Sequence, residues 1–436
     1  MPIYPVSPCP FHVGTYHSVN PLLHCIVSPS RRRIMRKTKP RADSDQWSVS
    51  RRGFLKGALA GAGLLSVGSY EAVAQMVGGS SVRGWGVPPG LVQISGNENA
   101  LGPSPRAVEA ILGLVYNINR YGQDPDLLGQ LARRHDIPVV EWSTSPFAPV
   151  KDPWISVGAG SSDLLYAIGH TYLKEGVESI EITPGFEFVR RMADQFGAKS
   201  VGVPVLKGFK PDLDGMRNAI TDRTGFMVVT TPGNPSGHLT PMSELKSFIE
   251  SIPPRVMVLV DEAYVDFAEN EADRVGAAPL IKDHPNVIVT RTFSKIFGMA
   301  GMRVGYAMAQ PEVIRTINAH KTNTLTMLST HAASAALEDH EHTRRSREMV
   351  LIGKRYFYDQ LKAMGVEYLP SESSFVMINT KADSDDIVNK LREEYNVLVG
   401  NARARWGIQG WLRVTAGLQE ENEAFISALK KVLVSS

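Results

Sequence analysis

Residues 286–303, which read NVIVTRTFSKIFGMAGMR, decide the fold of this chain. The stretch begins with a short β-branched run that is typical of a buried strand. Thr292, Ser294 and Lys295 follow where that strand ends, and ligands of open α/β sheets bind at this edge. A lysine there can form a Schiff base with an aldehyde. Thr292, Ser294 and Arg303 can together hold a dianionic phosphate, whereas a surface lysine after a strand is the alternative interpretation.

Apolar runs alternate with helical patterns on both sides of this stretch. Near-continuous apolar strands separated by helices indicate a mostly parallel sheet that helices cover on both faces. The sequence therefore predicts an α/β large domain with a mostly parallel seven-stranded sheet, whose strands cover residues 154–157, 179–182, 201–205, 226–230, 256–260, 287–290 and 303–308.

The pattern changes after Pro311 to longer helices, notably residues 340–364, with short strands near residues 375–379 and 411–415. These elements predict a smaller α+β domain. We expect four parts, which are a basic tail with an export signal (residues 1–75), a segment that joins the small domain (76–123), a large domain that holds the ligand (124–320) and a small C-terminal domain (321–436).

Charge and cysteine content exclude several functional classes. The 436 residues carry a formal net charge of +3, but residues 1–74 hold 10 of the 47 basic and 3 of the 44 acidic residues, so the remainder carries −4. This balance gives no support for binding nucleic acid or an anionic membrane. Both cysteines, Cys9 and Cys25, precede the globular part. The closest histidines in that part, His340 and His342, are predicted to be solvated, and no metal is expected.

Small polar or acidic residues follow three other predicted strands. Residues 158–163, GAGSSD, open a helix, so unpaired backbone N–H groups there can bind a phosphate, although N-capping by a serine is the alternative. Residues 231–237, TPGNPSG, are typical of a turn. Asp261 ends a buried apolar run, where an unpaired charge is costly unless a cation meets it.

The T-F-S-K motif, with Arg303 eight positions after its lysine, resembles the cofactor-lysine segment of fold-type I pyridoxal-phosphate enzymes. The resemblance is greatest to the histidinol-phosphate aminotransferase branch. Four further motifs occur in the order and spacing of that branch: NENALGPSP (residues 97–105), Arg120-Tyr121, NPSG (234–237) and LRVT (412–415). Ala100 and Gly122 stand where the branch has proline.

The resemblance implies a pyridoxal-phosphate-dependent aminotransferase that is a homodimer with its sites at the interface. It implies that Lys295 bonds the cofactor and then moves a proton as general base and acid. Asp261 would pair with the protonated pyridine nitrogen, and Arg413 with the substrate α-carboxylate. The other implied cofactor ligands are Ser161, Ser162, Thr292, Ser294, Arg303 and the partner's Tyr121 for the phosphate, Asn234 and Tyr264 for the phenolic oxygen, and Phe186 for the ring.

Several of these residues also have a simpler interpretation. Tyr121 and Phe186 are the residue types that fill an interface or a core, and they would then have only a packing role. Asp261 can cap a loop, and Arg413 can form a surface ion pair. The implied functions of these four side chains are therefore hypotheses about the site.

The N-terminal part resembles a twin-arginine export signal. Residues 50–56, SRRGFLK, precede a Gly/Ala-rich run at 57–68 and Ala72-Val73-Ala74. The run is too short to span a bilayer permanently, and a buried helix of the fold is the alternative. We expect the twin-arginine machinery to export a folded, cofactor-loaded protein to the periplasm, with no stable membrane span in the mature protein. Met35 is a second candidate start.

The substrate expectation comes from a departure from the family pattern. Histidinol-phosphate aminotransferases commonly carry an arginine for the substrate phosphate directly after the strand at 397–399, where this chain has Gly400-Asn401. We therefore expect an amino acid or amine without a phosphate as donor and a 2-oxo acid as acceptor, unless Arg403 or Arg405 compensates. A lyase or decarboxylase on the same fold, or a non-catalytic cofactor-binding protein, are the alternative functions.

Overall fold

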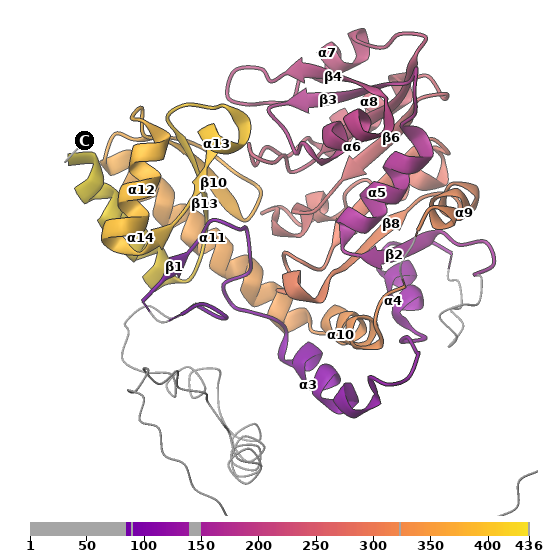
Figure 1. The fold of residues 1–436 in the computed structure, drawn as a ribbon, viewed down its shortest axis with the longest axis horizontal. Coiled ribbons are helices and arrows are strands. Elements are labelled where there is room, and N and C mark those ends of the chain that lie inside the picture. Colours follow the sequence, from indigo (N-terminus) through magenta and orange to yellow (C-terminus); the bar gives the residue numbers. More distant parts are fainter. Residues whose placement is uncertain (1–83, 89, 139–149, 322–323, 435–436) are drawn as a thin grey trace, which may run out of the picture. The chain divides into compact units, whose positions relative to one another are not determined.

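The computed structural model describes residues 84–88, 90–138, 150–321 and 324–434, which all belong to one compact unit, Ser69–Ser436. The basic tail, the twin-arginine segment and both cysteines lie outside these residues. Among the residues described, no helix is long and apolar enough to cross a membrane. Figure 1 draws the large sheet in magenta to orange and the C-terminal domain in orange to yellow.

The large sheet has seven strands in the order β2-β8-β7-β6-β5-β3-β4. All neighbouring pairs are parallel except those of β8, which runs antiparallel to β2 and to β7. The seven predicted strands and the α/β fold class are confirmed, with strand ends shifted by at most two residues. The strands are β2 (Ile155–Ala159), β3 (Glu178–Thr183), β4 (Lys199–Pro204), β5 (Thr224–Thr230), β6 (Met257–Asp261), β7 (Val287–Thr292) and β8 (Val304–Met308).

Both faces of this sheet are buried, because side chains along a strand alternate between its faces. On β7, Ile288 packs with the helices of one face, while Val287 and Val289 pack into the larger core on the other face. One face is covered by α5 (Ser161–Tyr172), α6 (Phe188–Phe196) and α9 (Pro311–Ala319). The other face contacts α4 (Leu127–Arg134) and α8 (Met242–Ser251).

The smaller domain is built on an antiparallel sheet of order β12-β13-β10-β9. Its strands are β9 (Glu367–Leu369), β10 (Phe375–Asn379), β12 (Gly400–Asn401) and β13 (Trp411–Thr415). Its helices are α11 (His340–Ala363), α12 (Ser384–Tyr395), the short α13 (Ala402–Trp406) and α14 (Gln419–Val434). Early in the chain, β1 (Val92–Gln93) pairs in parallel with β11 (Val397–Leu398), which ties the N-terminal segment to this domain.

The N-terminal segment forms α3 (Pro105–Leu114), which is followed by a 3-10 turn, Val115–Asn117. One local prediction is wrong. His342, expected in solvent, is buried. The reason is a long-range contact at the start of α11. Asp339 accepts hydrogen bonds from the His342 N–H (3.1 Å) and from the Ser104 hydroxyl (2.6 Å), so this helix end packs against the N-terminal segment.

Candidate active site

The ends of several strands meet at one edge of the large sheet. Since β8 lies between β2 and β7 and runs antiparallel to both, Arg303 at its start comes next to the residues that follow those two strands. A cavity of about 240 Å³ opens at this edge. Ten of the residues predicted from the sequence line it: Ser161, Phe186, Asn234, Asp261, Tyr264, Thr292, Ser294, Lys295, Arg303 and Arg413.

One side of the cavity is formed by the start of α5 and the guanidinium of Arg303. Gly160, just before the helix, has a φ of +81°, and a Cβ there would lie 2.2 Å from Arg303 Nη2. Only glycine therefore fits at this position. Arg303 Nη2 donates to the Ser162 hydroxyl (3.0 Å), and Ser161 begins the helix, where backbone N–H groups have no partner within the helix. These groups fit an anion such as a phosphate.

Hydroxyl groups complete the same side. Thr292 Oγ1 donates to Ser294 Oγ (3.0 Å) and accepts from the Ser294 backbone N–H (3.1 Å). Both side chains are buried, at the end of the strand that precedes Lys295. One cation, several hydroxyls and a helix N-terminus thus surround one place, which matches the charge and hydrogen-bonding needs of a phosphate.

Asp261 lies at the end of β6, where it is almost fully buried. Its Oδ1 accepts a hydrogen bond from the Thr290 hydroxyl (3.0 Å), and no cationic side chain of the described residues pairs with it. Burial raises the pKa of this carboxyl to about 6, with the neighbouring Glu262 acting in the same direction. When this buried carboxyl is ionised, a cationic partner stabilises it. A protonated ring nitrogen would be such a partner.

Lys295, Tyr264 and Asn234 surround the remaining space. The Lys295 ammonium lies 5.7 Å from the centre of the Tyr264 ring and donates to the Gly96 carbonyl (3.3 Å). The Tyr264 hydroxyl accepts from Asn97 Nδ2 (2.9 Å), so its own hydrogen is available to a ligand. Asn234 uses its Oδ1 to accept from Arg413, which leaves its amide nitrogen as a donor.

Arg413 reaches into the cavity from β13 of the small domain. Its Nη1 donates to Asn234 Oδ1 (2.9 Å) and its Nη2 to the Ser95 carbonyl (3.0 Å). Its Nε is buried and has no acceptor among the described residues. Burial, with the nearby guanidinium of Arg405, lowers the pKa of Arg413 to about 10, so the side chain stays charged at neutral pH. The unpaired donor fits a carboxylate ligand.

Comparison with known proteins gives the family. The sequence profile described as "Aminotransferase class I and II" matches residues 90–429. This chain belongs to that family. A histidinol-phosphate aminotransferase of Moorella thermoacetica is 34% identical over 344 residues, which are 79% of this chain and 86% of the relative. The chain is therefore an aminotransferase that moves an amino group between an amino acid or amine and a 2-oxo acid with pyridoxal phosphate as cofactor.

Two solved structures have the same fold as this chain. A putative histidinol-phosphate aminotransferase from Erwinia carotovora atroseptica superposes with a TM-score of 0.72 at 27% identity, over 79% of this chain and 96% of its own. The Sinorhizobium meliloti histidinol-phosphate aminotransferase, solved in complex with pyridoxal-5′-phosphate, gives 0.69 at 24% identity, over 85% and 95%. The aminotransferase thus has the mostly parallel sheet of fold type I.

Two predicted residues lie away from the aminotransferase cavity. Ser162 does not line it and instead accepts the hydrogen bond from Arg303. Tyr121 lies on the surface, 84% exposed, on the segment after α3. Seven residues that line the cavity were not predicted as site residues: Gly96, Asn97, Glu98, Thr230, Ala263, Ala300 and Arg405. The available signal for two of them, Asn97 and Glu98, was the NEN motif, which had served only as evidence of the resemblance.

The short helix α13 brings a further arginine to the cavity. This helix spans only five residues, too few to show a helical period in the sequence, and Asn401 caps its start by accepting from the Ala404 N–H (3.0 Å). Its last residue, Trp406, donates from Nε1 to the Gly185 carbonyl of the large domain (2.9 Å). This contact holds Arg405 at the cavity, with its guanidinium 4.9 Å from the Trp406 ring centre.

Proposed function

We propose that the aminotransferase holds the phosphate of its cofactor between α5 and Arg303, the ring nitrogen at Asp261 and the aldehyde carbon at Lys295. The observation that supports this assignment most strongly is that one cavity holds a lysine, a group of donors suited to a phosphate, and a buried carboxylate with no cationic partner in the described part of the chain. When bound, pyridoxal phosphate supplies an aldehyde that takes up the substrate amine and a ring that withdraws electrons.

Each side chain then has one task. Lys295 accepts a proton from the substrate α-carbon and returns it during the reaction. Arg413, whose Nε has no acceptor among the described residues, holds the substrate α-carboxylate and orients the α-carbon toward the lysine. Asp261 keeps the ring nitrogen protonated, and Asn234 and Tyr264 donate to the phenolic oxygen.

Product analysis tests the reaction type. We expect a new amino acid from the 2-oxo acid acceptor, whereas release of carbon dioxide or of an elimination product would contradict it.

The substrate side of the cavity supports a second acidic group on the substrate. Arg405 lines the cavity together with Arg413 and pairs with no carboxylate among the described residues. Arg403, two residues earlier on the same helix, binds Asp383 (3.0 Å) and Asp385 (2.8 Å) instead. Both arginines were candidates to replace the phosphate-binding arginine that the family has after the strand at 397–399. Because Arg403 is already paired, Arg405 is the one available to a ligand.

Gly400 explains why we expect a carboxylate rather than a phosphate. It pairs directly with Arg413 across the two strands, and a Cβ there would lie 3.6 Å from Arg413 Nε. An arginine at this position would stand beside Arg413, so the glycine leaves one cation fewer in the cavity. Arg405 then remains as the single guanidinium for the second acidic group of the substrate. One guanidinium matches a monoanionic carboxylate better than a dianionic phosphate. We propose amino dicarboxylic acids and 2-oxo dicarboxylic acids as preferred substrates.

Substitution of the two arginines tests this substrate class. Arg405→Gln is expected to raise KM for glutamate or aspartate about tenfold or more, because a charge-assisted pair contributes about 1.5 to 3 kcal/mol. Arg403→Gln is the matched control and should leave KM unchanged. Turnover of alanine, which has no second acid, should respond to neither variant. A kcat/KM that favours histidinol phosphate over the dicarboxylic amino acids would contradict the proposal.

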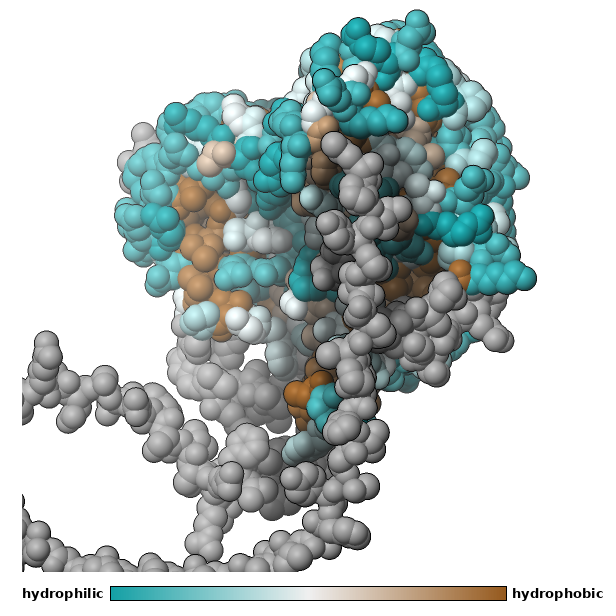
Figure 2. All heavy atoms as spheres, turned by 45° about the vertical axis from the view of Figure 1, so that its right-hand side comes forward, coloured by the Kyte–Doolittle hydropathy of each residue, from teal (hydrophilic) through white to brown (hydrophobic). Residues whose placement is uncertain are grey.

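We also propose that the functional form is a homodimer that joins through the α3 segment. Large apolar side chains are exposed along it, including Leu112 at 54%, Tyr116 at 91% and Ile118 at 66%. Hydrophobic surface lies at the lower end of the molecule in Figure 2, the end at which Figure 1 places α3. An apolar stretch of this kind is typical of a protein interface, and Tyr121 lies at its end, in a position to reach a partner's cofactor phosphate.

The dimer proposal predicts a change of mass in solution. Leu112→Glu combined with Ile118→Glu should convert a dimer to a monomer, because it places charges in the core of the interface. Light scattering coupled to size exclusion measures the mass. The control is the double variant Lys246→Glu with Lys362→Glu, which places the same two charges at exposed positions outside the α3 segment. This control should stay dimeric. A wild-type protein that is monomeric would contradict the proposal.

Export by the twin-arginine route remains a proposal, supported by the residue pattern at 50–74. The physical reason is that a cofactor loaded in the cytoplasm crosses only with a folded protein. Arg51→Lys with Arg52→Lys should retain the protein in the cytoplasm, as measured by fractionation of cells that express the full chain. Periplasmic recovery equal to that of the wild type would contradict this route.

A further inference from the structure

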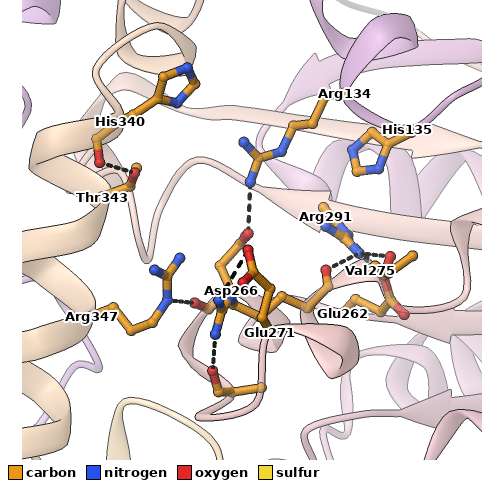
Figure 3. Close-up of polar contacts among 12 residues, drawn as sticks. Arg134, His135, Glu262, Asp266, Glu271, Val275, Arg291, His340, Thr343 and Arg347 are labelled. Atoms are coloured by element: carbon orange, nitrogen blue, oxygen red, sulfur yellow. Dashed lines mark hydrogen bonds and ion pairs between the residues drawn. The ribbon is translucent and has the colours of Figure 1, made fainter.

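A second, larger cavity of about 520 Å³ lies behind the cofactor strands. On β7, Thr290 and Thr292 face the active site, so Arg291 between them points to the opposite face of the sheet. Arg291 lines this second cavity together with Arg134, Arg274 and Arg347. The four arginines come from the end of α4, the 3-10 turn Ala272–Val275, β7 and α11. Figure 3 labels three of them, Arg134, Arg291 and Arg347, together with Asp266.

One of these arginines is fully neutralised. The Arg291 guanidinium binds Glu262 through Nε (2.9 Å) and Nη2 (2.8 Å), and both side chains are buried. Its Nη2 also donates to the Val275 carbonyl (2.8 Å). Arg291 therefore lines the cavity with its charge balanced by Glu262, as Figure 3 shows.

The other three arginines have too few acidic partners. Arg134 binds Asp266 Oδ1 (2.8 Å), and Glu271, which is 93% exposed, lies 3.8 Å from Arg274. Arg347 donates from Nε to the Asp266 carbonyl (2.8 Å) and pairs with no carboxylate in the part of the chain that the structure describes. Burial lowers the pKa of Arg347, and the charges of Arg274 and Arg134 contribute in the same direction. Three carboxylates also line the cavity, but Asp136 pairs with Lys282 and Glu271 is exposed, so Asp266 alone of these three is buried beside the arginines.

A purely structural role explains part of this arrangement. Arg134 of α4 and Arg347 of α11 both bind Asp266, which holds the segment 265–275 to these two helices. Arg274 bonds within the segment, to the carbonyls of Ala268 and Glu269. That role uses one guanidinium nitrogen of Arg274 and one of Arg347. It leaves the remaining donors of Arg347, which is half-buried, at the cavity, and charges that are partly removed from water in proteins are normally paired or bind an ion.

We propose that this cavity binds a small anion with phosphate or carboxylate groups, at a site separate from the active site. Guanidinium groups from three elements provide the forked donors that such groups need. The anion would also fasten the segment that follows Asp261 and Tyr264, both of which line the active site. Binding does not depend on transamination, so the proposal stands apart from the proposed substrate.

Calorimetric titration of the cofactor-loaded enzyme with inorganic phosphate at constant ionic strength tests the site. We expect one saturable site per chain whose affinity falls at least tenfold in Arg347→Gln and in Arg274→Gln. Arg345→Gln, an exposed arginine on the same helix, should bind phosphate as the wild type does, and so should Arg405→Gln, which rules out the substrate cavity. Absence of saturable binding, unchanged affinity in both cavity variants, or loss of binding in Arg405→Gln would each overturn the proposal.

Discussion

Lys295→Ala is expected to reduce transamination by about 100-fold to 10,000-fold or more, because proton transfer by a positioned side chain alone contributes that much. The variant loses both the group that bonds the cofactor and the group that moves the proton. The phosphate donors at Ser161, Thr292 and Arg303 remain, so it should still fold and bind pyridoxal phosphate. Circular dichroism and thermal unfolding check the fold, and cofactor absorbance checks the lysine bond.

The control for this variant is a lysine outside the cavity. Lys282 pairs with the exposed Asp136 at 2.8 Å, and Lys282→Ala should keep full activity. Absorbance of a lysine-bonded cofactor that persists in Lys295→Ala would contradict the assignment, since another lysine would then have to hold it.

Asp261→Asn is expected to lower kcat by about 100-fold or more. Removing one partner of a buried charge pair costs about 3 to 5 kcal/mol, and each 1.4 kcal/mol of barrier is a factor of ten. The fold should tolerate the change, because the amide oxygen can still accept from the Thr290 hydroxyl. Steady-state kinetics gives kcat, and unchanged turnover at saturating cofactor would contradict the function of Asp261.

The pH dependence of stability gives a second, independent measure of Asp261. Burial raises its pKa from 3.8 to about 6, so in the cofactor-free fold it keeps a proton that the unfolded chain has released. The free energy of unfolding of the cofactor-free protein therefore falls as pH rises from about 4 through about 6. Burial likewise raises the pKa values of Glu181 and Glu421 to about 7, so the decisive quantity is the difference from Asp261→Asn, which should lose less stability over this range.

Local patterns were sufficient to predict the large sheet and most of the cavity. Continuous apolar runs identify strands buried on two faces, and the ends of parallel strands necessarily meet at one edge. Asp261, Lys295 and Asn234 follow such runs directly, so their convergence could be expected before the fold was known. Arg413 required the resemblance, because a lone arginine within a strand does not indicate what it faces.

Other features depend on contacts between distant parts of the chain. The burial of His342 follows from the Ser104–Asp339 hydrogen bond, which joins residues 235 positions apart. Arg405 reaches the cavity because Trp406 bonds to the Gly185 carbonyl across the two domains. No periodicity in the sequence reports either contact. The arginine cavity behind β7 was missed for the same reason, since its four arginines come from four separate elements.

The most direct test of the central claim is to fix the cofactor chemically to the residue that holds it. The purified enzyme, loaded with pyridoxal phosphate, is treated with borohydride, digested and analysed by peptide mass spectrometry. The added mass should be on the peptide that contains Lys295, and adding a good amino donor before the reductant should remove it from that peptide. Attachment at any other lysine, or none in a cofactor-loaded protein, would contradict the account.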